Sequence, residues 1–110
     1  WPAVRRAAEK IVSKPEVSLD LSSLARAAHV SESHFRKLFR ETHGESPRAM
    51  QNRARMQKAC ELVLHSGRSI TEVALQQGFS TVHNFSRAFR REIGVSPREY
   101  RQKMLGPKRG

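Results

Sequence analysis

Cysteine, glycine, proline and aromatic residues are all scarce in this sequence of 110 residues. The single cysteine, Cys60, excludes an internal disulfide and provides too little sulfur for a zinc finger. No apolar run approaches the roughly 18 residues expected of a membrane-spanning helix. The hydrophobic fraction is 37%, so any core must be compact and shared between short elements. The composition therefore predicts one small domain or two very small lobes, outside the disulfide-rich and membrane-spanning classes.

Acidic residues are also in deficit. The chain has 21 lysines and arginines against 10 aspartates and glutamates, which gives a formal net charge of +11. A positive excess of this size favours polyanionic partners, namely DNA, RNA or an anionic membrane surface.

Apolar residues recur at helical spacing through almost the whole chain, and no strand pattern is present. The pattern divides into about seven helices. The first is expected at Pro2–Ser13, the longest at Pro47–His65 and the last from Pro97 to about Met104. The sequence therefore predicts an all-α fold.

Short polar residues stand where these helices should begin. The expected N-cap residues are Asp20, Ser31, Ser46, Ser69, Ser80 and Ser96. Ser69 and Ser96 are each followed three residues later by a glutamate, which is the spacing of a capping box. The helix that follows Ser31 is expected to stop at Gly44.

The second half of the chain repeats the first. Phe35 and Phe39 recur as Phe85 and Phe89, and the Arg, Gly, Ser, Pro and Arg that follow also recur at an offset of 50 residues. Upstream of the phenylalanines the offset is 49. One residue is therefore inserted in the second copy, at the start of its longer helix.

Each copy has the plan of a helix-turn-helix unit: a short helix, a tight break and a longer basic helix. Ala25 and Ala74 stand where the two helices of a unit cross closely, which only a small side chain permits. The turn needs a residue that tolerates a positive φ angle. Gly78 supplies it in the second copy, and His29 stands at the equivalent position in the first.

The predicted organisation is a first helix-turn-helix lobe at 1–46, a connecting helix at 47–66 and a second lobe at 67–110. A helix of about 19 residues spans roughly 28 Å at 1.5 Å per residue. With its flanking turns this length approaches the roughly 34 Å between successive major-groove turns on one face of DNA. The connecting helix is itself basic through Arg48, Arg53, Arg55 and Lys58.

The longer helix of each copy presents a polar, mostly basic stripe opposite its phenylalanines. Such a stripe fits the major groove, where arginine and lysine reach guanine acceptors and histidine or serine reads base edges. Ordinary solvated charges are the alternative, and the presence of the stripe in both copies favours recognition. The residues predicted to read bases are Ser33, Arg36, Lys37, His83, Ser86 and Arg87. Those predicted to contact phosphate are Ser31, Arg40, Ser80, Thr81 and Arg90.

The second copy contains a further set of motif residues: Gly78-Phe79-Ser80, Phe85 to Arg90, Gly94, Ser96-Pro97 and Tyr100-Arg101. Together they resemble the C-terminal signature of AraC/XylS-type bacterial transcription regulators. The similarity covers the chain from about Val4 to Arg101. It implies two helix-turn-helix lobes joined by a long helix, which bind asymmetric promoter sites in double-stranded DNA through the outward positions of both recognition helices.

The resemblance also implies partners and a location. A separate effector-sensing or dimerising domain is expected ahead of this one, because the chain begins at Trp1 rather than at an initiator methionine. RNA polymerase is an expected partner, and the cytoplasm, in association with the nucleoid, is the expected location. No cofactor is implied.

No metal site or catalytic set is predicted. The five histidines are not arranged in pairs at i, i+4 with a third ligand nearby, and no Ser/His/Asp set has a supporting motif. Cys60 is expected to be a small core residue. Enzyme activity is therefore the least favoured function.

Two other functions compete with sequence-specific DNA binding. The first is a cationic module that binds RNA or an anionic membrane through charge alone. Readers of RNA usually expose stacking aromatics, whereas all five phenylalanines here have interior positions. A membrane helix would need a large exposed apolar face, and none is available. The second is a protein adaptor that has lost contact with DNA, which the two basic stripes disfavour.

Overall fold

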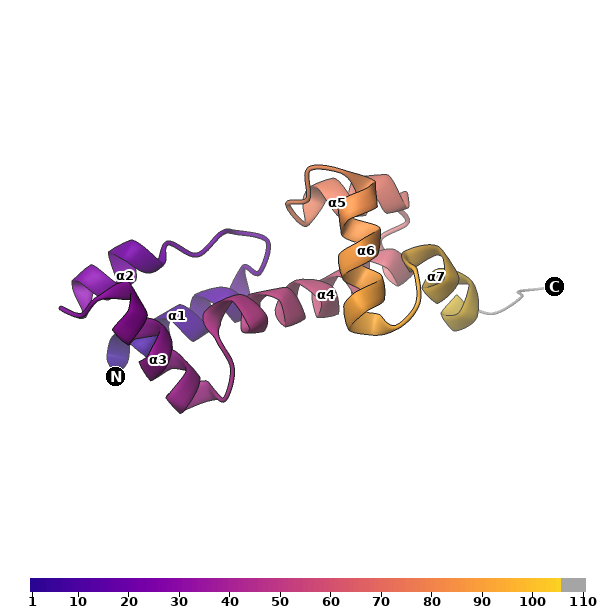
Figure 1. Ribbon diagram of the computed structural model, residues 1–110. Helices are drawn as coiled ribbons and strands as arrows, with labels where there is room; N and C mark the ends of the chain where they lie inside the picture. Colours follow the sequence, from indigo (N-terminus) through magenta and orange to yellow (C-terminus); the bar gives the residue numbers. More distant parts are fainter. Residues whose placement is uncertain (106–110) are drawn as a thin grey trace. The chain divides into compact units, whose positions relative to one another are not determined.

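The computed structural model describes residues 1–105, and this part of the chain consists of seven helices with no strand. The all-α prediction is confirmed. The helices are α1 (Pro2–Ser13), α2 (Leu21–Ala27), α3 (Glu32–His43), α4 (Pro47–His65), α5 (Ile70–Gln76), α6 (Val82–Ile93) and α7 (Pro97–Leu105). Figure 1 shows their order along the chain.

Short-range hydrogen bonds explain where most of these helices begin. The Asp20 carboxylate accepts from the backbone N–H of Ser23 at 3.1 Å, and the Ser31 hydroxyl accepts from that of His34 at 3.1 Å. Each bond satisfies one of the backbone donors that a helix leaves free in its first turn. The predicted caps at Ser46, Ser69 and Ser96 are likewise confirmed.

The two predicted capping boxes are both complete. Ser69 N donates to Glu72 Oε1 at 2.9 Å while Glu72 N donates to Ser69 Oγ at 3.1 Å. Ser96 and Glu99 make the same pair of bonds at 3.0 and 3.1 Å. The backbone bond from the serine lowers the pKa of each glutamate below its ordinary value, because it stabilises the charged carboxylate.

The expectation that Ser80 caps the helix after the second turn is wrong. The N-cap of α6 is Thr81, whose Oγ1 accepts from Asn84 N at 3.1 Å. Ser80 Oγ instead accepts from the Asn84 side chain at 3.4 Å. The inserted residue is the reason, because α2 and α5 begin 49 residues apart whereas α3 and α6 begin 50 apart. The extra residue pushes the helix start from Ser80 to Thr81.

Both turns contain the residue of positive φ that the repeat predicts. His29 has a φ of 60° and Gly78 a φ of 86°. His29 is the sole non-glycine residue with positive φ within residues 1–105. A side chain in this left-handed region normally costs about 1–2 kcal/mol, so the first turn has the more strained of the two solutions.

The chain forms two compact units, one of residues Trp1–Ala54 and one from Arg55 onward. The boundary falls inside α4. The first part of this helix therefore contributes to both cores: Met50 is buried in the core of the first unit, and Met56 in that of the second.

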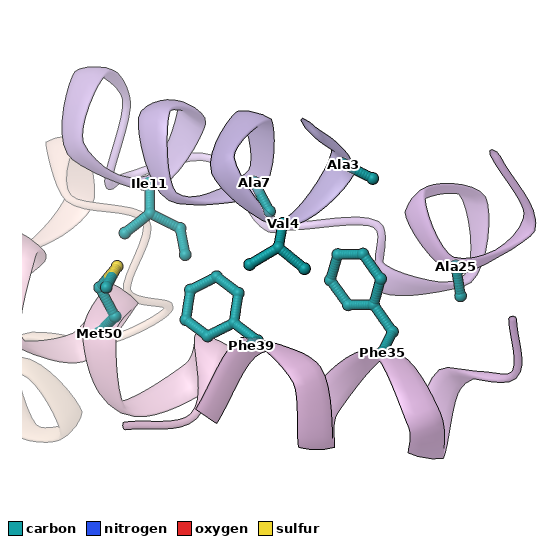
Figure 2. Close-up of a cluster of buried hydrophobic side chains, with 8 residues drawn as sticks. All are labelled: Ala3, Val4, Ala7, Ile11, Ala25, Phe35, Phe39 and Met50. Atoms are coloured by element: carbon teal, nitrogen blue, oxygen red, sulfur yellow. The ribbon is translucent and has the colours of Figure 1, made fainter. Parts of the chain in front are cut away.

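The first core lies between α1 and the long helix of the first turn unit. Val4, Ala7 and Ile11 lie along one face of α1 and are at most 1% exposed. Figure 2 shows this face turned toward the rings of Phe35 and Phe39 on α3. Both rings are fully buried. Complete burial of side chains of this size contributes about 1.5–3 kcal/mol each, so these rings determine which face of α3 remains exposed.

The second core repeats this arrangement with different chain segments. Met56, Ala59 and Val63 of α4 stand 52 residues after Val4, Ala7 and Ile11 of α1, and all are at most 2% exposed. They belong to one cluster with the two buried phenylalanines of α6. The end of α4 therefore supplies core residues to the second unit as α1 does to the first. The structural repeat thus includes these two segments, which lie outside the matching sequence motifs.

Matched side chains also hold the loop that precedes the first helix of each turn unit. Gln51 Nε2 donates to the carbonyl of Val17, in the loop between α1 and α2. Arg101, 50 residues later, donates through Nη2 to the carbonyl of Arg68 at 2.7 Å and through Nε to that of Val63 at 2.9 Å. Each unit thus fastens its own loop through its last helix.

Candidate nucleic-acid interface

The predicted stripe on α3 lies on the solvent side of the helix. Ser33, Arg36, Lys37 and Arg40 are all exposed. Their exposure follows from the burial of the two phenylalanines, because residues three and four apart share one face of a helix and the stripe occupies the opposite face. Three cationic side chains therefore stand in two turns of one exposed surface.

The stripe on α6 has the same placement. His83, Arg87 and Arg90 are exposed, and Ser86 is half-buried. Phe85 and Phe89 lie beneath them, with their ring centroids 5.7 Å apart. The structure therefore brings the predicted site residues of each unit onto the face of one helix.

The hydroxyl residues predicted to contact phosphate stand at the start of the two helices and are exposed. Ser31 and Thr81 use a hydroxyl oxygen to cap their helix. A capping hydroxyl keeps its O–H as a donor, so both residues can still donate to an anion. The same holds for Ser80, whose oxygen accepts from Asn84.

Glu32 is a member of the α3 surface that the stripe prediction omitted. Its Oε1 lies 3.2 Å from Nη2 of Arg36, and the two side chains are 45% and 52% exposed. Glutamate four residues before arginine is a favourable pair on a helix, and this spacing could have revealed the contact from the sequence. Arg36 therefore already has a partner on its own helix.

Arg55 was predicted only as one of the basic residues of the connecting helix. It is instead partly buried beside the second turn, where Nε and Nη2 donate to the carbonyl of Gln77 at 3.2 and 2.7 Å. Its guanidinium lies 4.4 Å from the centroid of the Phe79 ring. Burial lowers the pKa of Arg55 below its ordinary value, because it disfavours the charged guanidinium. This arginine stabilises the turn.

Three further points from the sequence concern Cys60, metal binding and membrane crossing. Cys60 is half-buried against the second core, and burial raises the pKa of its thiol. Within residues 1–105 no group of three or more histidine, cysteine, aspartate or glutamate side chains is placed to hold a metal ion. None of the helices in this range combines the length and the apolar character that a membrane crossing requires.

These features define a protein with two helix-turn-helix units, each with an exposed basic stripe on its second helix. A family model described as "Helix-turn-helix domain" matches residues 24–103. The HTH-type transcriptional regulator MtrA of Neisseria gonorrhoeae is 35% identical over 94 residues, which are 86% of this chain and 31% of that protein. The chain belongs to the AraC/XylS family of helix-turn-helix transcription regulators.

Solved structures show the same fold. The C-terminal domain of AraT, a response regulator from Geobacillus stearothermophilus, superimposes with a TM-score of 0.85 at 33% identity, over 100% of this chain and 92% of that one. The DNA-binding domain of the global transcriptional factor AdpA, solved in complex with a target DNA, gives a TM-score of 0.83 at 27% identity and covers 97% of both chains. The chain spans about a third of the length of the curated relatives it matches.

Proposed function

We propose that this chain binds double-stranded DNA sequence-specifically, as the DNA-binding part of a transcription regulator. The observation that carries the proposal is the exposed basic stripe, which occurs on the second helix of both helix-turn-helix units, above a pair of buried phenylalanines. The likeness to the AdpA domain, which was solved with its target DNA, supports it.

In this proposal α3 and α6 enter the major groove. Arginine and lysine donate to the O6 and N7 acceptors of guanine, and histidine and serine bond to other base edges. The base-reading residues are Ser33, Arg36 and Lys37 on α3, and His83, Ser86 and Arg87 on α6.

A second set of residues fixes each helix on the DNA backbone. Contacts to phosphate position a protein without reading sequence. Arg40 and Arg90 lie in the C-terminal half of their helices and supply charge. The hydroxyls of Ser31, Ser80 and Thr81 donate to phosphate oxygens at the helix starts.

The two stripes differ, so the DNA site should be asymmetric. Ser33, Arg36 and Lys37 in one unit correspond to His83, Ser86 and Arg87 in the other. The 19 residues of α4 give a length of roughly 28 Å, which suits two major-groove segments one helical turn apart. One chain then reads two unlike half-sites without a palindrome.

The function of the longer protein is part of the same proposal. The matched relatives are regulatory proteins about three times as long as this chain. We expect a further domain that senses an effector or dimerises, contact with RNA polymerase, and a cytoplasmic location at the nucleoid.

Selection of bound duplexes from a random DNA pool tests the proposal. At fixed salt, the enriched duplexes should contain two unlike sequence blocks about one helical turn apart, or about 10 base pairs. Absence of enrichment would contradict sequence-specific binding and favour a cationic module that binds through charge alone. A single enriched block would contradict recognition by both units.

A further inference from the structure

The two recognition helices differ in how their first turn is charged. Glu32 is the first residue of α3 and forms the ion pair with Arg36. The corresponding residues of α6 are Val82 and Ser86, and the first turn of α6 contains no acidic residue. An acidic residue in the first turn of the stripe-bearing helix thus belongs to the first unit alone.

This ion pair leaves most of the Arg36 guanidinium available. Glu32 accepts a hydrogen bond from Nη2 at 3.2 Å, whereas a guanidinium has five N–H donors in a rigid fork. The remaining donors can form a bidentate contact with the O6 and N7 atoms of guanine. Arg36 can therefore bond to a base while it keeps its contact with Glu32.

A phosphate contact has a different consequence for the pair. Phosphates lie along the rim of the groove, so Arg36 must swing away from Glu32 to reach one. The cost of breaking the ion pair weakens the contact of Arg36 with phosphate and leaves its contact with a base intact.

We propose that Glu32 is a specificity-determining residue, which holds Arg36 toward the base edges and away from phosphate at the first half-site. This inference rests on the proposed function. Exposed ion pairs shift equilibria by only a few fold, so Glu32 adjusts the ratio of specific to non-specific binding and does not abolish either.

The test compares Kd values for two duplexes, one selected from a random pool by the unaltered chain and one of scrambled sequence. For Glu32→Ala we expect scrambled-duplex binding to tighten about two- to fivefold, and the specificity ratio to fall by the same factor. The salt slope on the scrambled duplex should steepen by about 0.9, as expected for one additional phosphate contact. Glu32→Gln, which keeps a hydrogen-bond acceptor, should retain part of the ratio.

Two further variants separate this role from general charge. Glu9 is an exposed acid on α1 of the same unit, and Glu9→Gln should change binding to both duplexes by the same factor. In an Arg36→Ala background, Glu32→Ala should leave the specificity ratio unchanged. Circular dichroism melting of each variant measures any loss of folding.

Two results would overturn the inference. Glu32→Ala could leave the specificity ratio unchanged, or its effect on the ratio could persist without Arg36. Each of these leaves the proposed function standing, because the unaltered chain still prefers its selected duplex. A chain with no preference for any duplex would instead contradict the proposed function itself.

Discussion

Arg55 and Gln77 are joined by two hydrogen bonds, from Nε and Nη2 of the arginine to the backbone carbonyl of the glutamine. The contact links α4 to the turn before α6 within the second unit. Ala3 holds the matching position in the first unit, 52 residues earlier. An alanine cannot make these bonds, so the second turn has a side-chain support that the first turn lacks.

Replacement of Arg55 should destabilise the second unit. Arg55→Met keeps the length of the side chain but removes two charge-assisted hydrogen bonds and the contact with the Phe79 ring. The free energy of unfolding should fall by about 1–3 kcal/mol, and Arg55→Lys should recover part of it. Urea denaturation measures the change. Lys58→Met, at an exposed position of the same helix, is the control, and an equal loss there would contradict a specific role.

Substitution should affect stability more at one turn residue than at the other. Gly78→Ala places a Cβ at a φ of 86° and should lower the free energy of unfolding by about 1–2 kcal/mol. His29→Gly removes the strain of a side chain at a φ of 60° but increases the conformational entropy of the unfolded chain. The net change in the free energy of unfolding should therefore stay below about 1 kcal/mol. Gly44→Ala, with open space around the new Cβ, gives the backbone cost alone. Thermal melting that showed no loss for Gly78→Ala would exclude this account of the turn.

DNA binding should separate the two kinds of contact on α6. Arg87→Ala should cost about 1–3 kcal/mol on the selected duplex and relax sequence preference at one position. Arg90→Ala should weaken binding to all duplexes alike and reduce the salt slope by about 1. Fluorescence anisotropy titrations at several salt concentrations distinguish the two. Equal loss for Arg87→Ala on selected and scrambled duplexes would count against base readout.

The second unit should lose stability at acidic pH through its capping boxes. The pKa values of Glu72 and Glu99 are lowered in the folded state from the ordinary value of 4.5. The largest cause is the backbone hydrogen bond that each accepts, from Ser69 and from Ser96 respectively. A lowered carboxylate pKa contributes stability above 4.5, which is lost as the pH falls through the folded-state pKa. Melting temperatures from pH 7 to pH 3 should fall less in the doubly substituted Glu72→Gln, Glu99→Gln variant than in the unaltered chain. Parallel curves would refute the linkage.

Local signals made much of the fold predictable. The range Pro2–Ser13 agrees to the residue because a proline opens the helix and Pro15 follows its end. The caps at Asp20 and Ser31 involve partners three residues away. The positive φ of His29 followed from comparison with Gly78 in the repeat.

The errors and omissions have physical causes. Ser80 and Thr81 can both cap a helix, and their order in the turn depends on an insertion whose exact place the sequence does not reveal. The partner of Arg55 is a backbone carbonyl 22 residues away, and no side-chain pattern marks such an acceptor. The ion pair between Glu32 and Arg36 could have been predicted, because the two residues stand four apart on one helix. The assignment of base-reading and phosphate-binding residues stays a prediction, because it depends on how the DNA lies against α3 and α6.

The division of α4 between two cores affects how the chain can fold. The first turns of an α-helix are costly to form, whereas extension of an existing helix is favourable. Met50 belongs to one core and Met56 to the other, on a single uninterrupted helix. Whichever unit folds first therefore provides a nucleated helix that the other unit can extend. Helix nucleation is then already complete when the second unit folds.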